Sequence, residues 1–277
     1  MSSREGSVDF IIGDKIFKTW YLVVGDLKSG KIPLVLLHGG PGFSHHYMLA
    51  DRSLYEKAGI PLVFYDQIGN GNSSHVKDAP KDFWKPELFM DQLNGLLSHL
   101  GISDSFDLLG HSWGGMLAGR QLRRELLERG TDSLLKSQFL PDIYDIIEKH
   151  EREGTTDEKD YQDVVGQFMR KHVCTVDPWP AVFLQSLGEL EKDNTVYHTM
   201  WGPSEFSITG TMRGWTIIDI LHRISAPLDE VQSIAVMPWF LNVPKVKWVE
   251  LQNSTHLAQF EEPEKYFDVI LAFLERS

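Results

Sequence analysis

Apolar and polar positions alternate near the start of the chain. In SVDFIIGDKIFKTWYLVV (residues 7–24) the alternation runs on both sides of Gly13-Asp14. Successive side chains of a strand point to opposite faces, and a glycine-aspartate pair favours a tight turn between two strands. The pattern therefore predicts an antiparallel hairpin.

Three short runs that follow are apolar almost throughout, and each ends in histidine, aspartate or glycine. Strands of a parallel sheet are covered on both faces, so they show continuous apolar runs, and their carboxyl ends are where functional groups gather. The runs are IPLVLLH (32–38), IPLVFYD (60–66) and FDLLG (106–110). Between the last two, residues 86–101 carry apolar side chains at helical spacing and end at glycine, which predicts a helix.

The pattern changes between about residues 120 and 200. Charged amphipathic segments follow one another without a strand-like run, and the clearest are QLRRELLERG, LPDIYDIIEKHEREG and DYQDVVGQFMRKHV. These segments predict a helical cap inserted at 120–205 into a core formed by 1–119 and 206–277. The tail returns to the first pattern, with VKWVEL (246–251) expected as a strand and EKYFDVILAFLERS as a terminal helix.

Composition narrows the classes of protein. The 277 residues are 42% hydrophobic, enough for a full core, and the formal net charge of -12 argues against a nucleic-acid partner, which needs clustered basic residues. The single cysteine, Cys174, cannot form an internal disulfide, and the polar N-terminus lacks an apolar signal segment, so a cytoplasmic location is expected. No apolar run approaches the roughly 18 residues of a membrane span, so no membrane association is expected.

The strand at 106–110 leads into a candidate nucleophile. Residues 110–114 read Gly-His-Ser-Trp-Gly, a G-x-S-x-G motif between a predicted strand and a predicted helix. A serine on such a sharp turn exposes its hydroxyl at the sheet edge, and small neighbours let the chain fold tightly beneath it. Ser112 is therefore the predicted nucleophile.

A second glycine-rich turn, His38-Gly39-Gly40-Pro41-Gly42, follows the first of the apolar runs. Acyl transfer needs backbone N–H groups aimed at the oxyanion that develops on the substrate, and glycine lets the backbone approach closely. The amides of Gly40 and Trp113 are the predicted oxyanion donors.

A serine hydrolase also needs a base, and His256 is the best candidate among 11 histidines. It follows a predicted strand and a short polar loop near the C-terminus, in the chain order nucleophile, acid, histidine that this kind of site uses. The adjacent His45 and His46 and the remaining histidines lack metal-ligand spacing, so neither a metal nor another cofactor is expected.

The motifs together resemble the proline iminopeptidases, α/β-hydrolases of the prolyl aminopeptidase family. The resemblance rests on HGGPG, DQIGNGNS (66–73), GHSWGG, WGPSEF (201–206) and STH (254–256), and it covers most of the chain. It implies an α/β-hydrolase fold, with a mostly parallel sheet flanked by helices and a helical cap. Ile68 stands where the family usually has arginine.

The same resemblance assigns three carboxylates. Asp229 matches the acid that orients His256, while Glu205 and Glu230 match the pair that holds the free α-ammonium of the substrate. Two carboxylates around one ammonium form charge-assisted hydrogen bonds that a blocked peptide cannot replace. By composition alone, both glutamates are ordinary surface acids among 39 acidic residues.

Two core strands of the family pattern have no counterpart in the sequence. Ala226-Pro227-Leu228 leads straight to Asp229, and GMLAGRQ runs directly into LRRELLERG. Neighbouring strands lie about 4.8 Å apart, so an unfilled gap of two strands would displace His256 by about 10 Å. Either the C-terminal strand pairs directly beside the Ser112 strand and the loops re-aim His256, or the triad is not assembled.

The sequence thus predicts a serine aminopeptidase that resembles proline iminopeptidase and releases an N-terminal residue, with proline as one candidate, from small peptides or amides. Two alternatives stay open. One is an esterase or amidase of the same fold, because function belongs to the site and not to the scaffold. The other is a catalytically inactive hydrolase-like protein, which the loss of core strands would explain.

Overall fold

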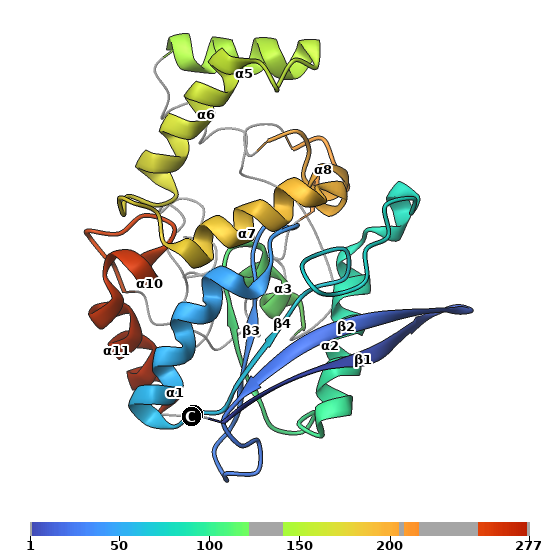
Figure 1. Ribbon diagram of the computed structural model, residues 1–277, viewed down its shortest axis with the longest axis vertical. Helices are drawn as coiled ribbons and strands as arrows, with labels where there is room; N and C mark the ends of the chain where they lie inside the picture. The colour runs from blue at the N-terminus through green and yellow to red at the C-terminus, as the bar shows by residue number, and fades with distance from the viewer. Residues whose placement is uncertain (1, 122–140, 205–207, 216–248, 276–277) are drawn as a thin grey trace.

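A five-stranded sheet forms the centre of the molecule (Figure 1). The computed structural model describes residues 2–121, 141–204, 208–215 and 249–275. The strands are β1 (Ser3–Ile12), β2 (Lys15–Val24), β3 (Leu34–Leu37), β4 (Leu62–Tyr65) and β5 (Asp107–Gly110), in the spatial order β1-β2-β4-β3-β5. β3 pairs in parallel with both β4 and β5, whereas β1 with β2 and β2 with β4 are antiparallel. The predicted hairpin and the three predicted parallel strands are confirmed.

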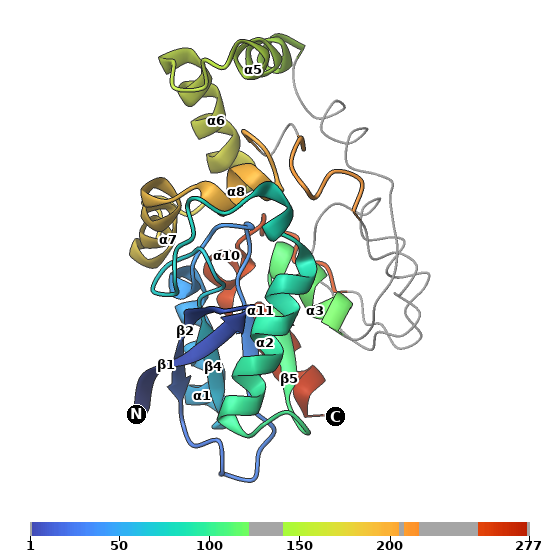
Figure 2. The ribbon, with the colours of Figure 1, turned by 90° about the vertical axis from the view of Figure 1, so that its right-hand side faces the viewer.

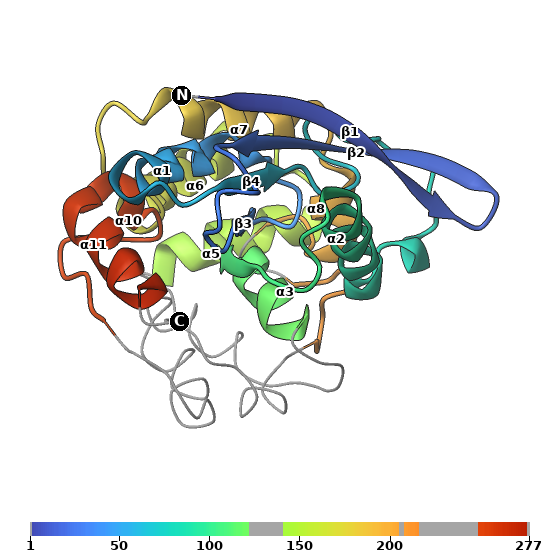
Figure 3. The ribbon, with the colours of Figure 1, turned by 90° about the horizontal axis from the view of Figure 1, so that it is seen from below.

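Helices cover both faces of the sheet. Alternate residues of β3 and β4 point to opposite sides, so Val35 and Val63 pack with α2 (Pro86–Leu100) and α3 (Trp113–Gln121). Leu34 and Leu62 pack on the other side with α1 (Arg52–Ala58) and α11 (Pro263–Leu274). Figure 3 shows the two layers with the sheet between them. The continuous apolar runs of the sequence are explained by this double burial.

The tip of the β1-β2 hairpin projects beyond the helical layers (Figures 1 and 3). Gly13 closes the turn with φ 61°, a left-handed conformation that glycine adopts without strain. Near the tip the paired Ile11 and Ile16 are 65% and 63% exposed, whereas Val23 and Val24 at the other end of β2 are buried. Towards the tip only one face of the hairpin packs on the core, through Phe10, Ile12 and Phe17.

The segment from residue 141 to residue 200 is helical, as predicted, and lies above the carboxyl ends of β3 and β4 (Figures 1 and 2). α7 (Ala181–Lys192) packs against the short helix η1 (His45–Asp51), and Phe183 joins the core on the α1 side. The other helices here are α5 (Pro141–Glu153), α6 (Lys159–His172) and α8 (Thr195–Met200). The predicted helix at 121–130 lies almost wholly outside the described residues.

Two further short helices complete the described part of the chain, η2 (Lys81–Phe83) and α10 (Ala258–Glu261). The predicted C-terminal helix is confirmed as α11, but the strand expected at 246–251 is not seen where it is described, at 249–251. There the carbonyl of Glu250 accepts a hydrogen bond from Lys265 Nζ at 2.6 Å, and that of Leu251 accepts one from the Ser254 N–H at 3.1 Å. Both carbonyls therefore bond to groups outside a strand ladder.

The first turn of α3 lies directly on the end of β3. A Cβ atom on Gly114 would stand 2.0 Å from the Leu37 carbonyl oxygen, and one on Gly110 would stand 2.3 Å from the Gly114 carbonyl oxygen. These neighbours are backbone atoms, which cannot rotate away as a side chain can. Glycine at both positions is therefore a requirement of the packing.

We expect Gly114→Ala to lower the free energy of unfolding by at least about 2 kcal/mol, because the added methyl group forces β3 and α3 apart. Gly95→Ala is the matched control. Gly95 is an exposed helical residue of α2 with nothing within 4 Å of an added Cβ, so alanine there should stabilise the protein by roughly 0.5–1 kcal/mol. Urea unfolding monitored by circular dichroism measures both, and equal effects would contradict the steric argument.

Candidate active site

Ser112 lies on the turn between β5 and α3. Its φ is 54°, and it is the only residue besides glycine with a positive φ among the residues that the structure describes. The left-handed region is unfavourable for a side-chain-bearing residue and is held only where the surroundings enforce it. The Ser112 carbonyl accepts hydrogen bonds from the N–H groups of Gly115 (2.9 Å) and Met116 (3.2 Å), so the serine directly precedes the first helical turn. This is the sharp strand-to-helix turn that the G-x-S-x-G motif predicts.

The second glycine-rich turn lies against Ser112. A Cβ atom on Gly39 would stand 3.1 Å from the Ser112 Cβ, and Gly40 has φ 111°. Trp113 is the first residue of α3, where backbone N–H groups lack partners within the helix and the helix dipole favours negative charge. The two predicted oxyanion donors, Gly40 and Trp113, thus belong to segments that meet at the serine.

The side chain of Gln67 joins these two segments. It is fully buried, donates from Nε2 to the His38 carbonyl at 2.9 Å, and accepts at Oε1 from the Trp113 indole N–H at 2.9 Å. Its backbone N–H also donates to His38 Nε2 at 3.0 Å. Gln67 therefore fixes the turn after β3 relative to the start of α3.

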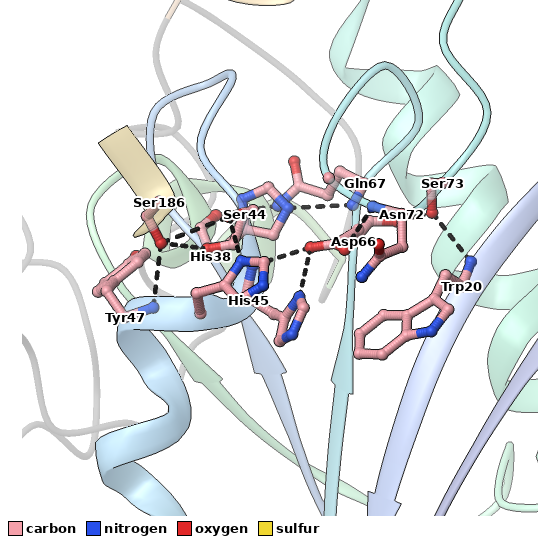
Figure 4. A network of polar contacts seen from close by, with 12 residues as sticks. Trp20, His38, Ser44, His45, Tyr47, Asp66, Gln67, Asn72, Ser73 and Ser186 are labelled. Atoms are coloured by element: carbon pink, nitrogen blue, oxygen red, sulfur yellow. Dashed lines mark hydrogen bonds and ion pairs between the residues drawn. The ribbon is translucent and has the colours of Figure 1, made fainter. Parts of the chain in front are cut away.

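Asp66 organises a buried polar network beside that turn (Figure 4). One carboxylate oxygen accepts from the backbone N–H (2.8 Å) and the Nδ1 (2.9 Å) of His45, and the other accepts from the Asn72 N–H (2.9 Å). Burial alone would raise the pKa of Asp66, but the hydrogen bond and charge interaction with His45, together with His38 and the Asn72 N–H, lower it. The carboxylate is therefore held in its charged form, and His45 has a structural partner.

His38 is held as a neutral imidazole. Burial lowers its pKa from 6.5 to about 4, although the nearby Asp66 opposes the change. The hydrogen bonds agree, because Nε2 accepts from the Gln67 N–H and must therefore be unprotonated, while Nδ1 donates to the Gly39 carbonyl at 3.0 Å. Protonation of Nε2 would break the first of these contacts.

His256 is brought to the nucleophile turn. The ring centroids of His256 and His111, the residue before Ser112, lie 4.4 Å apart, and His111 Nε2 lies 2.8 Å from the His256 carbonyl oxygen. The described residues show this contact with His111 but no C-terminal strand paired with β5, so the assembly of the triad stays a prediction.

The polar loop before His256 is anchored by two neighbouring carboxylates of the C-terminal segment. Glu262 accepts from the Asn253 N–H at 2.9 Å and from the Ser254 hydroxyl at 2.8 Å. Glu261 accepts from the N–H and the hydroxyl of Thr255. The residues that precede His256 are thus held by carboxylates that follow it in the sequence.

Asp229, Glu205 and Glu230 lie outside the described residues, so Ser112, His256, Gly40 and Trp113 are the candidates whose positions are known. Within the described segments no cluster of histidine, cysteine, aspartate and glutamate could hold a metal ion, and no helix is long and apolar enough to cross a membrane. Cys174 is buried in the core on the α1 side, and burial raises its pKa.

Five residues that shape the site were not among those predicted from the sequence: His111, Tyr47, Gln67, Glu261 and Glu262. Gln67 lies inside the DQIGNGNS motif and His111 inside G-x-S-x-G. Both motifs were recognised in the sequence, but neither of these two residues was given a role. Glu261 and Glu262 carry no local signal, because their partners are recognised only once the chain has folded.

The fold and the nucleophile turn define an α/β-hydrolase, and residues 32–125 match the family model described as alpha/beta hydrolase fold. A proline iminopeptidase of Clostridioides difficile is 32% identical, covering 99% of each chain. Two solved structures are also similar over 98% of each chain: VinJ, with 38% identity and a TM-score of 0.88, and the proline iminopeptidase of Mycobacterium smegmatis, with 33% identity and a TM-score of 0.83. The chain belongs to the proline iminopeptidase family of α/β-hydrolases.

Ile68 differs from the arginine usual in this family, and the structure accounts for its apolar character. Its side chain is fully buried in the apolar core on the α2 side, and its N–H donates to Gln92 Oε1 at 2.9 Å. The position is therefore part of the packing in this chain.

The neutral state of His38 predicts a pH dependence. Because the unfolded state takes up a proton near pH 6.5 and the folded state only near pH 4, His38 lowers the stability as the pH falls through this range, by about 3 kcal/mol in total. In His38→Gln the amide oxygen can still accept from the Gln67 N–H but does not titrate. Between pH 7 and pH 4 we expect the free energy of unfolding of this variant to fall by about 3 kcal/mol less than that of the parent.

Urea unfolding at several pH values measures this difference. Burial raises the pKa of the Asp51 carboxyl to about 7, which changes stability in the opposite sense, so the comparison must be between variant and parent. If the free energies of unfolding of the two proteins changed in parallel with pH, His38 would not contribute to the pH dependence of stability.

Proposed function

We propose that this protein is a serine aminopeptidase that releases an N-terminal residue, with proline the first candidate, from small peptides or amino-acyl amides. The observation that carries the proposal is the left-handed Ser112 between β5 and α3, with the Gly39-Gly40 turn against it and His256 packed on the adjacent His111. Membership of the proline iminopeptidase family supports the choice of substrate.

In the proposed reaction the Ser112 hydroxyl attacks the carbonyl carbon of the first residue, and His256 takes the hydroxyl proton. The amides of Gly40 and Trp113 donate to the oxyanion, at a helix N-terminus that favours negative charge. His256 then gives the proton to the leaving amine, and a water molecule cleaves the acyl-enzyme by the same route. The neutral network around His38 and Gln67 supports this by fixing the two donor segments.

Three carboxylates complete the proposed site. Asp229 would orient His256, and Glu205 and Glu230 would hold the α-ammonium of the substrate. Ser204, next to Glu205, is 7% exposed and donates to Glu151 of α5, which supports a fixed position for that end of the cap. The proposed helical cap, residues 120–205, would then supply part of the substrate site.

The proposed partner is a small substrate with a free N-terminus, handled in the cytoplasm without a metal, another cofactor, nucleic acid or a membrane. The net charge of -12 suits a site that attracts an ammonium group and repels polyanions.

Hydrolysis of an arylamide panel by the purified protein tests the proposal. The prolyl and alanyl arylamides should be cleaved, and the N-acetylprolyl form should react at least about a hundredfold more slowly, because it lacks the ammonium group. Ser112→Ala should lower kcat/KM by about 10³-fold or more.

The double variant Glu205→Gln/Glu230→Gln is the matched test of amine recognition. It should raise KM for free prolyl arylamide while leaving the slow reaction of the acetylated form unchanged. Equal cleavage of free and acetylated forms would favour an esterase or amidase of the same fold. No Ser112-dependent turnover from folded protein would identify a catalytically inactive member.

A further inference from the structure

A chain of three hydrogen bonds connects the oxyanion turn to His256 through the residue before the nucleophile. The Gly39 N–H donates to Tyr47 Oη at 2.7 Å, Tyr47 Oη lies 2.8 Å from His111 Nδ1, and His111 Nε2 lies 2.8 Å from the His256 carbonyl oxygen. The residues come from the loop after β3, from η1, from the nucleophile turn and from the loop before α10. His111 is therefore connected to two segments that the proposed reaction needs. It contacts the His256 loop directly, and it reaches the oxyanion turn through Tyr47.

A backbone group fixes the direction of two of the three hydrogen bonds, and the third follows for a neutral imidazole. A carbonyl oxygen only accepts, so His111 Nε2 must carry a hydrogen and donate to His256. In a neutral imidazole Nδ1 is then an acceptor, and the Tyr47 hydroxyl donates to it. The hydroxyl oxygen in turn accepts from Gly39, since a backbone N–H only donates. Tyr47, which is 2% exposed, thus selects the tautomer of His111 that can hold His256.

We propose that His111 is a positioning residue for His256, acting through the backbone carbonyl of that histidine. The imidazole rings, with centroids 4.4 Å apart and planes 50° from one another, add packing to the hydrogen bond. The contact is half-buried, and it reaches His256 directly, whereas the carboxylate anchors hold Asn253, Ser254 and Thr255 before it in the chain. His111 therefore contacts His256 itself, through both its ring and its backbone carbonyl.

This inference deepens the proposed function and rests on the role of His256 as the base. If the inference holds, the reactivity of Ser112 depends on His111 Nε2, which bonds to the His256 carbonyl, and not directly on Nδ1. A shift of about 1 Å in a reacting group can cost about a hundredfold in rate, so loss of the contact should be measurable as a loss of rate.

Two variants separate the two nitrogens. In His111→Gln the carboxamide reaches the position of Nε2 and can donate to the His256 carbonyl. In His111→Asn it reaches only the position of Nδ1, where it can accept from Tyr47. Each variant loses one hydrogen bond of the chain, so thermal unfolding should change by a similar amount in both.

The first readout is the rate at which a fluorophosphonate modifies Ser112. In this reaction the serine oxygen bonds to phosphorus, fluoride leaves and His256 takes the proton, so the rate reports the serine-histidine pair without requiring the natural substrate. We expect His111→Asn to react about tenfold or more slowly than the parent and His111→Gln to stay within about threefold. On any arylamide that the parent cleaves, kcat should fall in His111→Asn while KM stays unchanged.

Equal rates in the two variants, or a parent that the fluorophosphonate does not modify, would overturn the inference. A parent that is modified but cleaves no amino-acyl arylamide would contradict the proposed aminopeptidase and leave the role of His111 standing. If His111→Asn does not fold, nitrogen NMR of the parent gives a second test. The Nε2–H tautomer of His111 is required, and the Nδ1–H tautomer would overturn the inference.

Discussion

The site depends on the close approach of two backbones, where the first turn of α3 lies on the end of β3. Side chains at Gly110 or Gly114 would overlap main-chain atoms, so the distance between the two segments is set by backbone contact. This contact holds Ser112 in its left-handed conformation and brings the turn after β3 against it. One of these segments carries the serine and the other carries the expected oxyanion donor. Their separation therefore sets the geometry between the nucleophile and that donor.

Around this contact the protein buries polar groups and satisfies them. A buried carboxylate costs several kcal/mol unless hydrogen bonds and charge compensate for its lost hydration. Asp66 receives three hydrogen bonds on its two oxygens, and a Cβ on Gly71 would stand 2.3 Å from one of them, so glycine is required there. The charged state of Asp66 and the neutral state of His38 are the states that these hydrogen bonds need. The loops after β3 and β4 therefore form one unit beneath the cap helices.

The parts of the fold that the sequence predicted are those set by local patterns. The hairpin, the three parallel strands and the helix from Pro86 to Leu100 follow from period, burial and a terminal glycine, all of which can be recognised within a few residues. The nucleophile turn could be predicted for the same reason, because its glycines are required by packing inside the motif. The contacts of His111 could not, since they join it to Tyr47 and to His256, which are 64 and 145 residues away in the sequence. The expected strand at 246–251 is not seen at 249–251, its described part, where Lys265 donates to the Glu250 carbonyl.

His256, the proposed base, lies in a loop with no strand before it among the described residues. A strand fixes the following loop through several ladder hydrogen bonds, whereas here Glu261, Glu262 and His111 hold the loop through side chains. Glu261 also accepts from Thr175 of the segment between α6 and α7, so the loop is connected to the helices above the sheet. The alignment with the Clostridioides difficile relative spans 303 positions, more than the 277 residues of this chain, so that relative contains residues that have no counterpart here. Whether those residues include the two strands expected from the family stays a prediction. In the part of the chain that the structure describes, side-chain contacts thus fix the loop that carries His256.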